Sequence, residues 1–190
     1  MRITGGVHRS RPLHAPKGVS TRPTADRVRE AMFSILESRH AVVGAKVLDL
    51  YAGTGALGLE AISRGAERAT FVECSRTALG ALRANVELLR VEAQVRVVAG
   101  LVERSLGLLA ADGAFDFVLV DPPYALVRGG EAPVAVGEIV ESGALAAEGI
   151  VVLEHGKEDA SPLIRGLSLS DVRRYGDTLL AFYTGVPQSP

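Results

Sequence analysis

The chain has 190 residues, of which 47% are hydrophobic and 23% charged, a composition typical of one globular domain and unlike that of a disordered or fibrous protein. The single cysteine, Cys74, excludes an internal disulfide framework, and no apolar run approaches the roughly 20 residues that a membrane-spanning helix needs. We therefore expect a cytoplasmic protein with no membrane association, and a monomer.

The net charge of −1 conceals an uneven distribution along the chain. Residues 1–30 hold seven basic and two acidic side chains, so this segment is +5 and the remaining 160 residues carry −6. A basic segment on an acidic body suits a polyanion such as nucleic acid, because phosphate contacts supply most of the sequence-independent affinity. A solvated, partly disordered tail is the alternative interpretation.

Residues 1–23 are rich in Gly, Pro, Arg and His and show no helical period, which predicts a basic arm or hairpin. Thr24 is a good helix N-cap, and the apolar residues that follow it recur at helical spacing. Arg27 and Arg29 fall outside that apolar stripe. We therefore divide the chain into an N-terminal arm, residues 1–23, and one catalytic domain, residues 24–190.

After Gly44, short β-branched runs alternate with amphipathic segments, a pattern that indicates a parallel sheet covered by helices on both faces. The predicted strands are "KVLDLY", "ATFVEC", "VRVVAG", "FDFVLVDPPY" and "GIVVLEHG". The closing "LSLSDVRRYGDTLLAFYTG" predicts a hairpin, since the turn at Gly176 leaves no room for a crossover helix. The sequence thus predicts an α/β, doubly wound, Rossmann-like fold with one antiparallel strand.

The segment Gly53-Thr54-Gly55-Ala56-Leu57-Gly58 matches the G-x-G-x-x-G pattern of a dinucleotide-binding turn between a strand and a helix. Glycines in such a turn let the backbone approach a ligand, and Glu73, at the end of the second strand, can accept hydrogen bonds from ribose hydroxyls. Both features suit any adenosine cofactor. They do not separate NAD from S-adenosylmethionine.

Asp49, four residues before Gly53, favours S-adenosylmethionine. Its carboxylate lies where the ammonium group of the methionine part could bind, whereas the pyrophosphate of NAD would gain nothing from an acid there. The alternative is that Asp49 accepts hydrogen bonds from the N–H groups of the turn itself.

The loop "DPPY", Asp121 to Tyr124, follows the buried fourth strand at the same edge of the sheet. Two consecutive prolines stiffen the loop and leave carbonyl acceptors. The exocyclic amine of a base is a poor nucleophile, and acceptors such as Asp121 and the Pro122 carbonyl would favour its tetrahedral form, while Tyr124 offers a face for stacking. The alternative is a purely structural role, in which the prolines stiffen a turn and Tyr124 packs in the core.

These motifs resemble the bacterial small-subunit ribosomal RNA guanine-N2 methyltransferases of the RsmD type. The resemblance rests on "MRITGGVHRSRPLHAP", "TRPTADRVREAMFSIL", "VLDLYAGTGALGLEAISRGA", "FVE", "FDFVLVDPPY" and "YGDTLL". It implies a seven-stranded class I methyltransferase fold, S-adenosylmethionine as donor with S-adenosylhomocysteine as product, and the N2 amine of one guanine in 16S rRNA as acceptor. The implied partner is 16S rRNA or the assembling small ribosomal subunit.

The resemblance also implies roles for individual residues. The family often has an acidic residue near the adenine after the third strand, where this chain has Gly100 and Leu101, so we expect Leu101 and the backbone to hold the adenine. Of the basic residues near the N-terminus, Arg9, Arg11, Lys17 and Arg27 are our expected RNA contacts. The expected catalytic residues are Asp121, Pro122, Pro123 and Tyr124; the expected cofactor contacts are Arg22, Thr24, Asp49, Gly53, Thr54, Gly55, Glu73 and Leu101.

Three other functions are open to the same motifs. A DNA adenine-N6 methyltransferase would share the glycine turn and DPPY, although the chain leaves no room for a separate target-recognition domain. A non-catalytic RNA-binding or ribosome-assembly factor could retain the fold, and a nicotinamide oxidoreductase is disfavoured because no residue set for hydride transfer is evident.

For several other polar residues we expect structural rather than functional roles. We expect Cys74 to be a packed structural thiol, His155 a solvated loop residue, and Asn85 a tether between a helix and a strand. The four histidines have no metal-ligand spacing, so we expect no metal.

Overall fold

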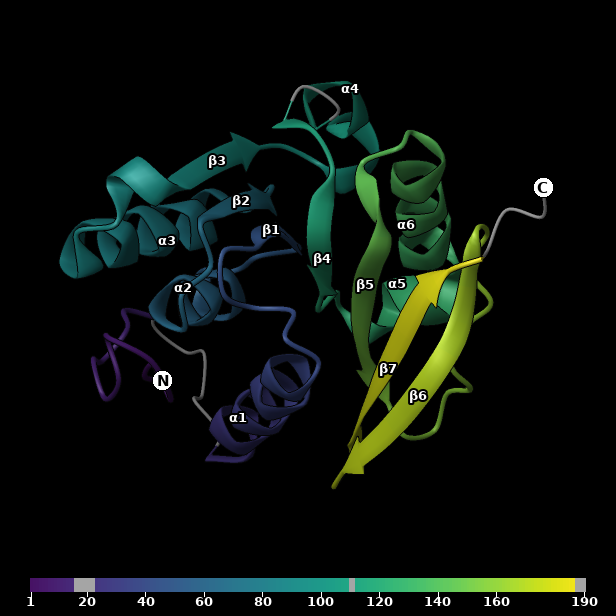
Figure 1. Ribbon diagram of the computed structural model, residues 1–190, viewed down its shortest axis with the longest axis horizontal. Coiled ribbons are helices and arrows are strands. Elements are labelled where there is room, and N and C mark those ends of the chain that lie inside the picture. Colours follow the sequence, from purple (N-terminus) through teal and green to yellow (C-terminus); the bar gives the residue numbers. More distant parts are fainter. Residues whose placement is uncertain (16–22, 110–111, 187–190) are drawn as a thin grey trace.

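The computed structural model describes residues 1–15, 23–109 and 112–186, with the side chains of Pro23 and Thr24 left out (Figure 1). Seven strands form one sheet in the order β3-β2-β1-β4-β5-β7-β6. Strands β1 to β5 pair in parallel, and β7 runs antiparallel to both β5 and β6. The predicted mostly parallel sheet with a C-terminal hairpin is therefore confirmed. The strands are β1 (Lys46–Leu50), β2 (Arg68–Glu73), β3 (Val95–Ala99), β4 (Phe115–Val120), β5 (Leu145–Gly156), β6 (Leu167–Tyr175) and β7 (Thr178–Gly185).

Helices cover both faces of the sheet, as the uniformly apolar strands require. Along β5, Val152 belongs to the core under α1, α2 and α3, and the next residue, Leu153, belongs to the core under α5 and α6. In Figure 1, α2 and α3 lie on the opposite side of the sheet from α5 and α6. The helices are α1 (Pro23–Ser38), α2 (Ala56–Ser63), α3 (Arg76–Leu89), α4 (Leu106–Leu109), α5 (Tyr124–Gly129) and α6 (Glu131–Glu141), with short 3-10 turns at Glu92–Gln94 and Val102–Arg104.

The glycine turn between β1 and α2 is tightly packed. Gly55 has φ +79°, a left-handed conformation that favours glycine, and a Cβ built there would lie 2.2 Å from a methyl carbon of Leu82. A Cβ on Gly58 would lie 2.4 Å from the ring of Phe71 on β2. These two glycines therefore serve close packing of α2 against its neighbours, whereas Gly53 faces open space.

The structure differs from the expected elements in two places. Strand β5 begins at Leu145, several residues before "GIVVLEHG", because its first residue already pairs with Phe115 of β4. Tyr124, expected in the DPPY loop, is the first residue of the short helix α5. The C-terminal hairpin is as predicted: Tyr175 pairs with Thr178 across a turn in which Gly176 has φ +63°.

The N-terminal residues form a hairpin that is packed against the domain. Arg2 and Pro12 make an antiparallel bridge, the Ile3 N–H donates to the Arg11 carbonyl at 3.0 Å, and Ile3 and Leu13 are buried. Of the two forms expected for this segment, arm or hairpin, the described residues adopt the hairpin. Within the described part of the chain, no helix is long and apolar enough to cross a membrane.

A buried carboxylate on α2 holds this hairpin in place. Glu60 is fully buried and accepts the N–H groups of Thr4 at 2.8 Å and Gly5 at 2.7 Å. It also pairs with Arg64 at 2.8 Å and with Arg29 of α1 at 3.3 Å. Arg29, expected outside the apolar stripe, is buried because Glu60 and Asp26 provide its charge partners.

Candidate active site

A cavity of about 350 Å³ lies at the carboxyl ends of β1, β4 and β5, and Ala25 and Arg29 of α1 also line it. Ligands bind at this edge in open α/β sheets, where the direction of strand order reverses. Here β1 lies between β2 and β4, which places the reversal at the cavity. The cavity is lined by Met1, Ala25, Arg29, Asp49, Tyr51, Ala52, Gly53, Thr54, Ala56, Leu57, Ala78, Asp121 and Glu154.

Asp49 makes the hydrogen bond with the glycine turn that was considered for it, and it also faces the cavity. The side chain is buried, its Oδ2 accepts the Gly58 N–H of the first turn of α2 at 2.9 Å, and the residue lines the cavity. Burial raises the pKa of the Asp49 carboxyl well above its usual value, and the negative charges of Asp121 and Glu73 act in the same direction, against the hydrogen bond from Gly58. A bound cation would favour its ionised form.

Glu73 holds the glycine turn in position. Its Oε2 accepts the Gly53 N–H at 2.7 Å, and its Oε1 accepts the Ser75 N–H at 2.6 Å. Gly53 itself lines the cavity, and a Cβ built on it would meet only the Tyr51 carbonyl oxygen, at 3.9 Å. The turn therefore offers open space above a backbone that Glu73 fixes.

The other expected cofactor residues differ in where they lie. Thr54 lines the cavity, and its hydroxyl donates to the sulfur of Met1 at 3.5 Å. Gly55 lies beneath the turn, and Leu101, which is 44% exposed, lies outside the cavity lining. Arg22 lies outside the described residues, and of Thr24 only the backbone is described, in the first turn of α1.

Asn85 of α3 joins the glycine turn to the N-terminal hairpin. Its amide nitrogen donates to the carbonyls of Thr54 at 3.0 Å and His14 at 3.1 Å, and its oxygen accepts the His14 N–H at 2.7 Å. The sequence predicted that Asn85 would join the helix to a strand, but it joins the helix to two loops. The signal in the sequence was an asparagine on the apolar side of an amphipathic helix. It could not identify the partners, which lie 31 and 71 residues away in sequence.

Two further carboxyl groups face the cavity from neighbouring strands. Asp121 follows β4 and is exposed to the cavity, yet the surrounding protein raises the pKa of its carboxyl to about 6 by desolvation. Glu154, near the end of β5, has its pKa raised to about 8, first by desolvation and then by the charge of Asp121. The hydrogen bond from Tyr124 and the charge of Arg29 act in the opposite direction. Sequence reasoning did not select Glu154, although its place at a strand end on the ligand-binding edge was the signal.

The remainder of the DPPY loop lies beside the cavity. Pro122 is buried, and the Pro123 carbonyl accepts the Leu126 N–H at 2.8 Å as α5 begins. The Tyr124 hydroxyl lies 3.4 Å from Glu154 Oε1 and 3.3 Å from Thr178 Oγ1. Tyr124 lines a different, smaller pocket of about 260 Å³, together with Arg128 and Gly156. Asp121 is therefore the residue of this motif that faces the cavity directly.

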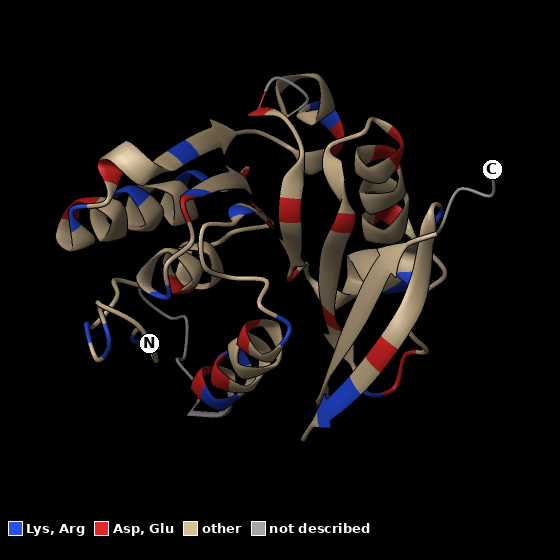
Figure 2. Cartoon of the chain, in the orientation of Figure 1, with Lys and Arg blue, Asp and Glu red and all other residues tan. Residues whose placement is uncertain are grey.

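Three of the expected RNA-binding residues, Arg9, Arg11 and Arg27, are exposed, and no acidic group of the described residues lies within ion-pair distance of them. Arg29, in contrast, is neutralised by Asp26 at 2.7 Å and by Glu60. Figure 2 shows basic segments on the N-terminal hairpin and mixed charges along α1. Lys17 lies outside the described residues.

Two structural expectations were wrong. Cys74 is exposed, because it follows the last residue of β2 and no longer packs in the sheet. His155 is fully buried within β5, and its Nε2 lies 3.0 Å from the Ser161 hydroxyl. His155 thus ties the end of β5 to the following loop.

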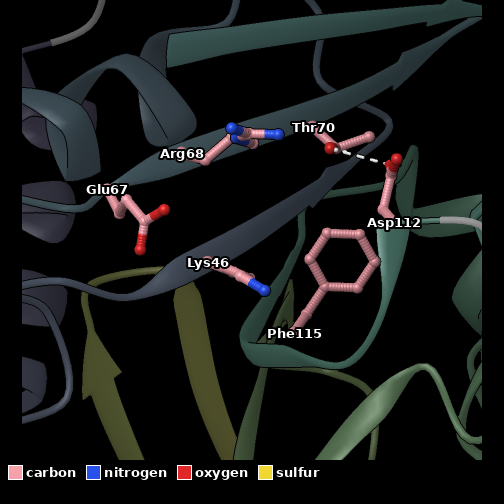
Figure 3. A pocket seen from close by; sticks show the side chains of 6 residues that line it. All are labelled: Lys46, Glu67, Arg68, Thr70, Asp112 and Phe115. Carbon is pink, nitrogen blue, oxygen red and sulfur yellow. Dashed lines mark hydrogen bonds between the residues drawn. The ribbon is translucent and has the colours of Figure 1, made fainter.

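A pocket of about 130 Å³ lies at the opposite edge of the sheet (Figure 3). Lys46 and Arg68, the first residues of β1 and β2, line it, and the Thr70 hydroxyl donates to Asp112 at 3.1 Å. Asp112 also pairs with Arg96. This pocket lies at the far ends of the strands from the glycine turn. In the described ranges, no group of His, Cys, Asp and Glu side chains could hold a metal ion.

The chain is similar in sequence and in fold to known proteins. A family model described as conserved hypothetical protein 95 matches residues 1–184. The ribosomal RNA small subunit methyltransferase D of Escherichia coli strain K12 is 37% identical over 165 residues, which cover 86% of this chain and 79% of that protein. The solved structure of E. coli yhhF, provisionally described as a methyltransferase, superposes with a TM-score of 0.82 at 33% identity, covering 99% of both chains.

A more distant structure shares the fold alone. The magnesium protoporphyrin IX methyltransferase of Synechocystis PCC 6803, solved with bound SAM, has a TM-score of 0.65 at 15% identity and covers 86% of this chain and 80% of its own.

Proposed function

Since the chain belongs to the conserved hypothetical protein 95 family, that of the RsmD-type ribosomal RNA methyltransferases, we propose that it transfers a methyl group from S-adenosylmethionine to the exocyclic N2 amine of a guanine in 16S ribosomal RNA. The family supports a methyltransferase acting on ribosomal RNA. The cavity and its side chains support the finer choice of cofactor and amine.

The observation that carries the proposal is the charge of the cavity. Asp49, Asp121 and Glu154 line it, and Arg29, the one residue among those described that brings a guanidinium to the lining, is already paired with Asp26 and Glu60. Such a cavity favours a ligand with positive charge. S-adenosylmethionine carries a sulfonium and an ammonium group, whereas NAD would bring a pyrophosphate toward three carboxyl groups.

The residues present fit this cofactor. Asp49 is placed to bind the ammonium group, and Gly53 and Thr54 leave room for close approach of the ligand. Glu73, which already accepts two backbone N–H groups, retains lone pairs for the ribose hydroxyls. Leu101 offers an apolar surface for the adenine, and further contacts from Arg22 and Thr24 belong to the proposal.

When bound, S-adenosylmethionine supplies a methyl group on a sulfonium centre, which becomes a neutral thioether as the methyl leaves. The amine loses one proton as its nitrogen bonds the methyl carbon and keeps the other. We assign the hydrogen-bond acceptors of the amine to Asp121 and the Pro122 carbonyl, since the Pro123 carbonyl is occupied by Leu126, and the Asp121 carboxylate takes up the released proton. Orientation and electrostatic preorganisation then provide the catalysis, with Tyr124 stacking on the flipped base.

Exposed basic residues provide the contacts with RNA. Arg9 and Arg11 on the hairpin and Arg27 on α1 are available for phosphates, and Lys17 lies between them in sequence. The hairpin reaches the cavity through Met1, so RNA bound along it would be adjacent to the methyl-transfer site.

The test offers a methyl-labelled donor to 30S subunits, naked 16S rRNA and DNA, each followed by nuclease digestion and chromatography. Labelled N2-methylguanosine from either ribosomal substrate is the expected product. Labelled N6-methyladenine from DNA would replace the proposal with the DNA methyltransferase. Absence of transfer, together with no cofactor binding in calorimetry, would indicate a non-catalytic RNA-binding factor.

A further inference from the structure

Asp121, directly after β4, and Glu154, on the adjacent strand β5, lie at equivalent positions along the sheet. Val120 of β4 pairs in parallel register with Leu153 of β5, so the residues that follow them, Asp121 and Glu154, lie side by side at the sheet edge. Neighbouring strands are about 4.8 Å apart. Both side chains line the same cavity. The fold therefore presents two carboxyl groups next to each other.

The position of Glu154 is fixed from several sides. Its neighbours in sequence, Leu153 and His155, are fully buried, and β7 pairs with β5 along this stretch. The Tyr124 hydroxyl of α5 donates to Glu154 Oε1 at 3.4 Å. The charged and titratable groups that act on it are Asp121 from β4, Tyr124 from α5 and Arg29 from α1. The side chain of Glu154 is thus held in position facing the cavity.

Two adjacent acceptors match one edge of guanine. Guanine presents two neighbouring donors, N1–H and the N2 amine, whereas adenine presents a donor amine beside the N1 lone pair. An ionised carboxylate facing a lone pair would leave both groups without a hydrogen bond, which is costly away from water. Binding of a cationic cofactor nearby favours the ionised form of Glu154.

We propose that Glu154 is the specificity-determining residue of the site: its carboxylate accepts the N1–H of the target guanine while Asp121 accepts from the N2 amine. This assignment rests on the proposed function and adds to it a reason why guanine is chosen over a base with an unprotonated N1. It gives Glu154 a direct contact with the substrate.

The probe is 2-aminopurine, which keeps the methyl-accepting amine of guanine but has a lone pair at N1. It is placed by splinted ligation at the methylated position of 16S rRNA, and the RNA is offered in the form, naked or assembled, that the native enzyme accepts. For the wild type we expect kcat/KM to be about 10- to 100-fold lower on the 2-aminopurine substrate, the cost of one unpaired buried polar group.

In Glu154→Gln this preference should fall to within about threefold, because the amide can turn either its oxygen to N1–H or its nitrogen to the N1 lone pair. Glu154→Ala, which offers neither group, should also lose the preference. The matched control is Glu148→Gln, an exposed glutamate near the other end of β5, which should retain the wild-type ratio.

Cofactor binding by calorimetry and thermal unfolding establish that each variant is folded. The inference is overturned if the wild type has the same kcat/KM on the guanine and 2-aminopurine substrates. It is also overturned if folded Glu154→Gln keeps the wild-type ratio of these two kcat/KM values. Failure of the proposed function is a separate result, since unmodified RNA would then yield no N2-methylguanosine.

Discussion

The carboxyl groups in the cavity differ in their hydrogen-bond partners. Asp49 accepts from Gly58, Glu154 accepts from Tyr124, and Asp121 makes no hydrogen bond with another described residue. A free acceptor that faces the cavity is the group best placed to bind a substrate proton. This distinction is why we place Asp121 at the amine and Asp49 at the cofactor.

Replacement of Asp121 tests that division of roles. In Asp121→Ala we expect kcat/KM for methyl transfer to fall by about 10²- to 10³-fold, the usual effect of removing one preorganised polar contact to a reacting group. The dissociation constant for S-adenosylmethionine should change by only a few fold. Single-turnover transfer and calorimetry measure the two quantities.

The matched control is Asp116→Ala, on the same strand but at its amino-terminal end, where the side chain accepts the Lys46 N–H at 2.7 Å. This variant should transfer methyl groups at the wild-type rate. Full activity in Asp121→Ala would remove Asp121 from the mechanism.

Glu154 should make stability depend on pH. Desolvation raises the pKa of its carboxyl to about 8, above the value of about 4.3 for an unfolded chain. Between these values the folded protein holds a proton that the unfolded chain has released, so the free energy of unfolding falls as pH rises through that interval. Asp121, with its pKa raised to about 6 by desolvation, adds to the fall at the lower end.

Glu154→Gln cannot titrate, so its Tm in the absence of ligand should equal that of the wild type near pH 4 and exceed it progressively up to pH 8. Each kcal/mol gained in the free energy of unfolding raises Tm by about 2 to 4 °C in a protein of this size. Differential scanning calorimetry across that range measures the effect. A constant difference in Tm at all pH values would show that Glu154 is ionised in the folded protein.

Local sequence indicated the residues of the glycine turn and DPPY because each motif is contiguous. It did not indicate Glu154 or the burial of Arg29, because each depends on partners brought together only by folding. Arg29 is buried against Glu60, which lies 31 positions away. Glu154 gains its significance from register with Asp121, which no spacing within one strand reveals.

Among the elements, α3 connects the N-terminal hairpin with the glycine turn. Asn85 is fully buried and makes hydrogen bonds with Thr54 and His14, so one side chain fixes two loops. Removing it leaves their backbone groups without these partners.

For Asn85→Ala we expect a loss of about 1 to 3 kcal/mol in stability and a cofactor affinity about tenfold weaker, because the glycine turn is no longer held in its binding form. Urea unfolding and calorimetry give the two values, and amide exchange at His14 should accelerate. Thr77→Ala, an exposed position on the same helix, is the control and should behave as the wild type. Unchanged affinity in Asn85→Ala would show that the turn holds its shape alone.

The helices and strands could be predicted where apolar residues recur along the sequence with the spacing of one element type. Parallel strands read as β-branched runs, and the tight turn at Gly176 identified the last two strands as a hairpin. Helix α5 escaped prediction because it has six residues and follows two prolines. The early start of β5 depends on pairing with β4, which is a contact between segments distant in sequence.

At the scale of the whole molecule, charge is separated by location. Exposed arginines lie on the N-terminal hairpin, whereas carboxyl groups line the cavity that this hairpin reaches through Met1, so anionic and cationic ligands each have a surface of suitable sign. The net charge of −1 gave no sign of this arrangement, although the distribution along the sequence did.

Neutralising the hairpin tests the RNA surface. Arg9→Gln/Arg11→Gln should weaken RNA binding and reduce the slope of log affinity against log salt concentration by about 1.4 to 1.8, the loss of two phosphate contacts. Filter binding at several salt concentrations gives both numbers. Cofactor affinity should not change.

The control is Arg165→Gln/Arg174→Gln, which removes the same charge from exposed positions outside the N-terminal hairpin. If both double variants lose affinity equally, the hairpin makes no particular contact and only net charge matters.

The anchorage of the hairpin has a consequence for biosynthesis. Residues 1–14 are synthesised before the groups that hold them, Arg29, Glu60 and Asn85. This segment must therefore remain without its partners until α3 has emerged, and the cavity wall formed by Met1 is completed only then. In a nascent chain, formation of the complete cavity would thus follow docking of the N-terminal hairpin, although that hairpin is synthesised earlier than the elements that it docks on.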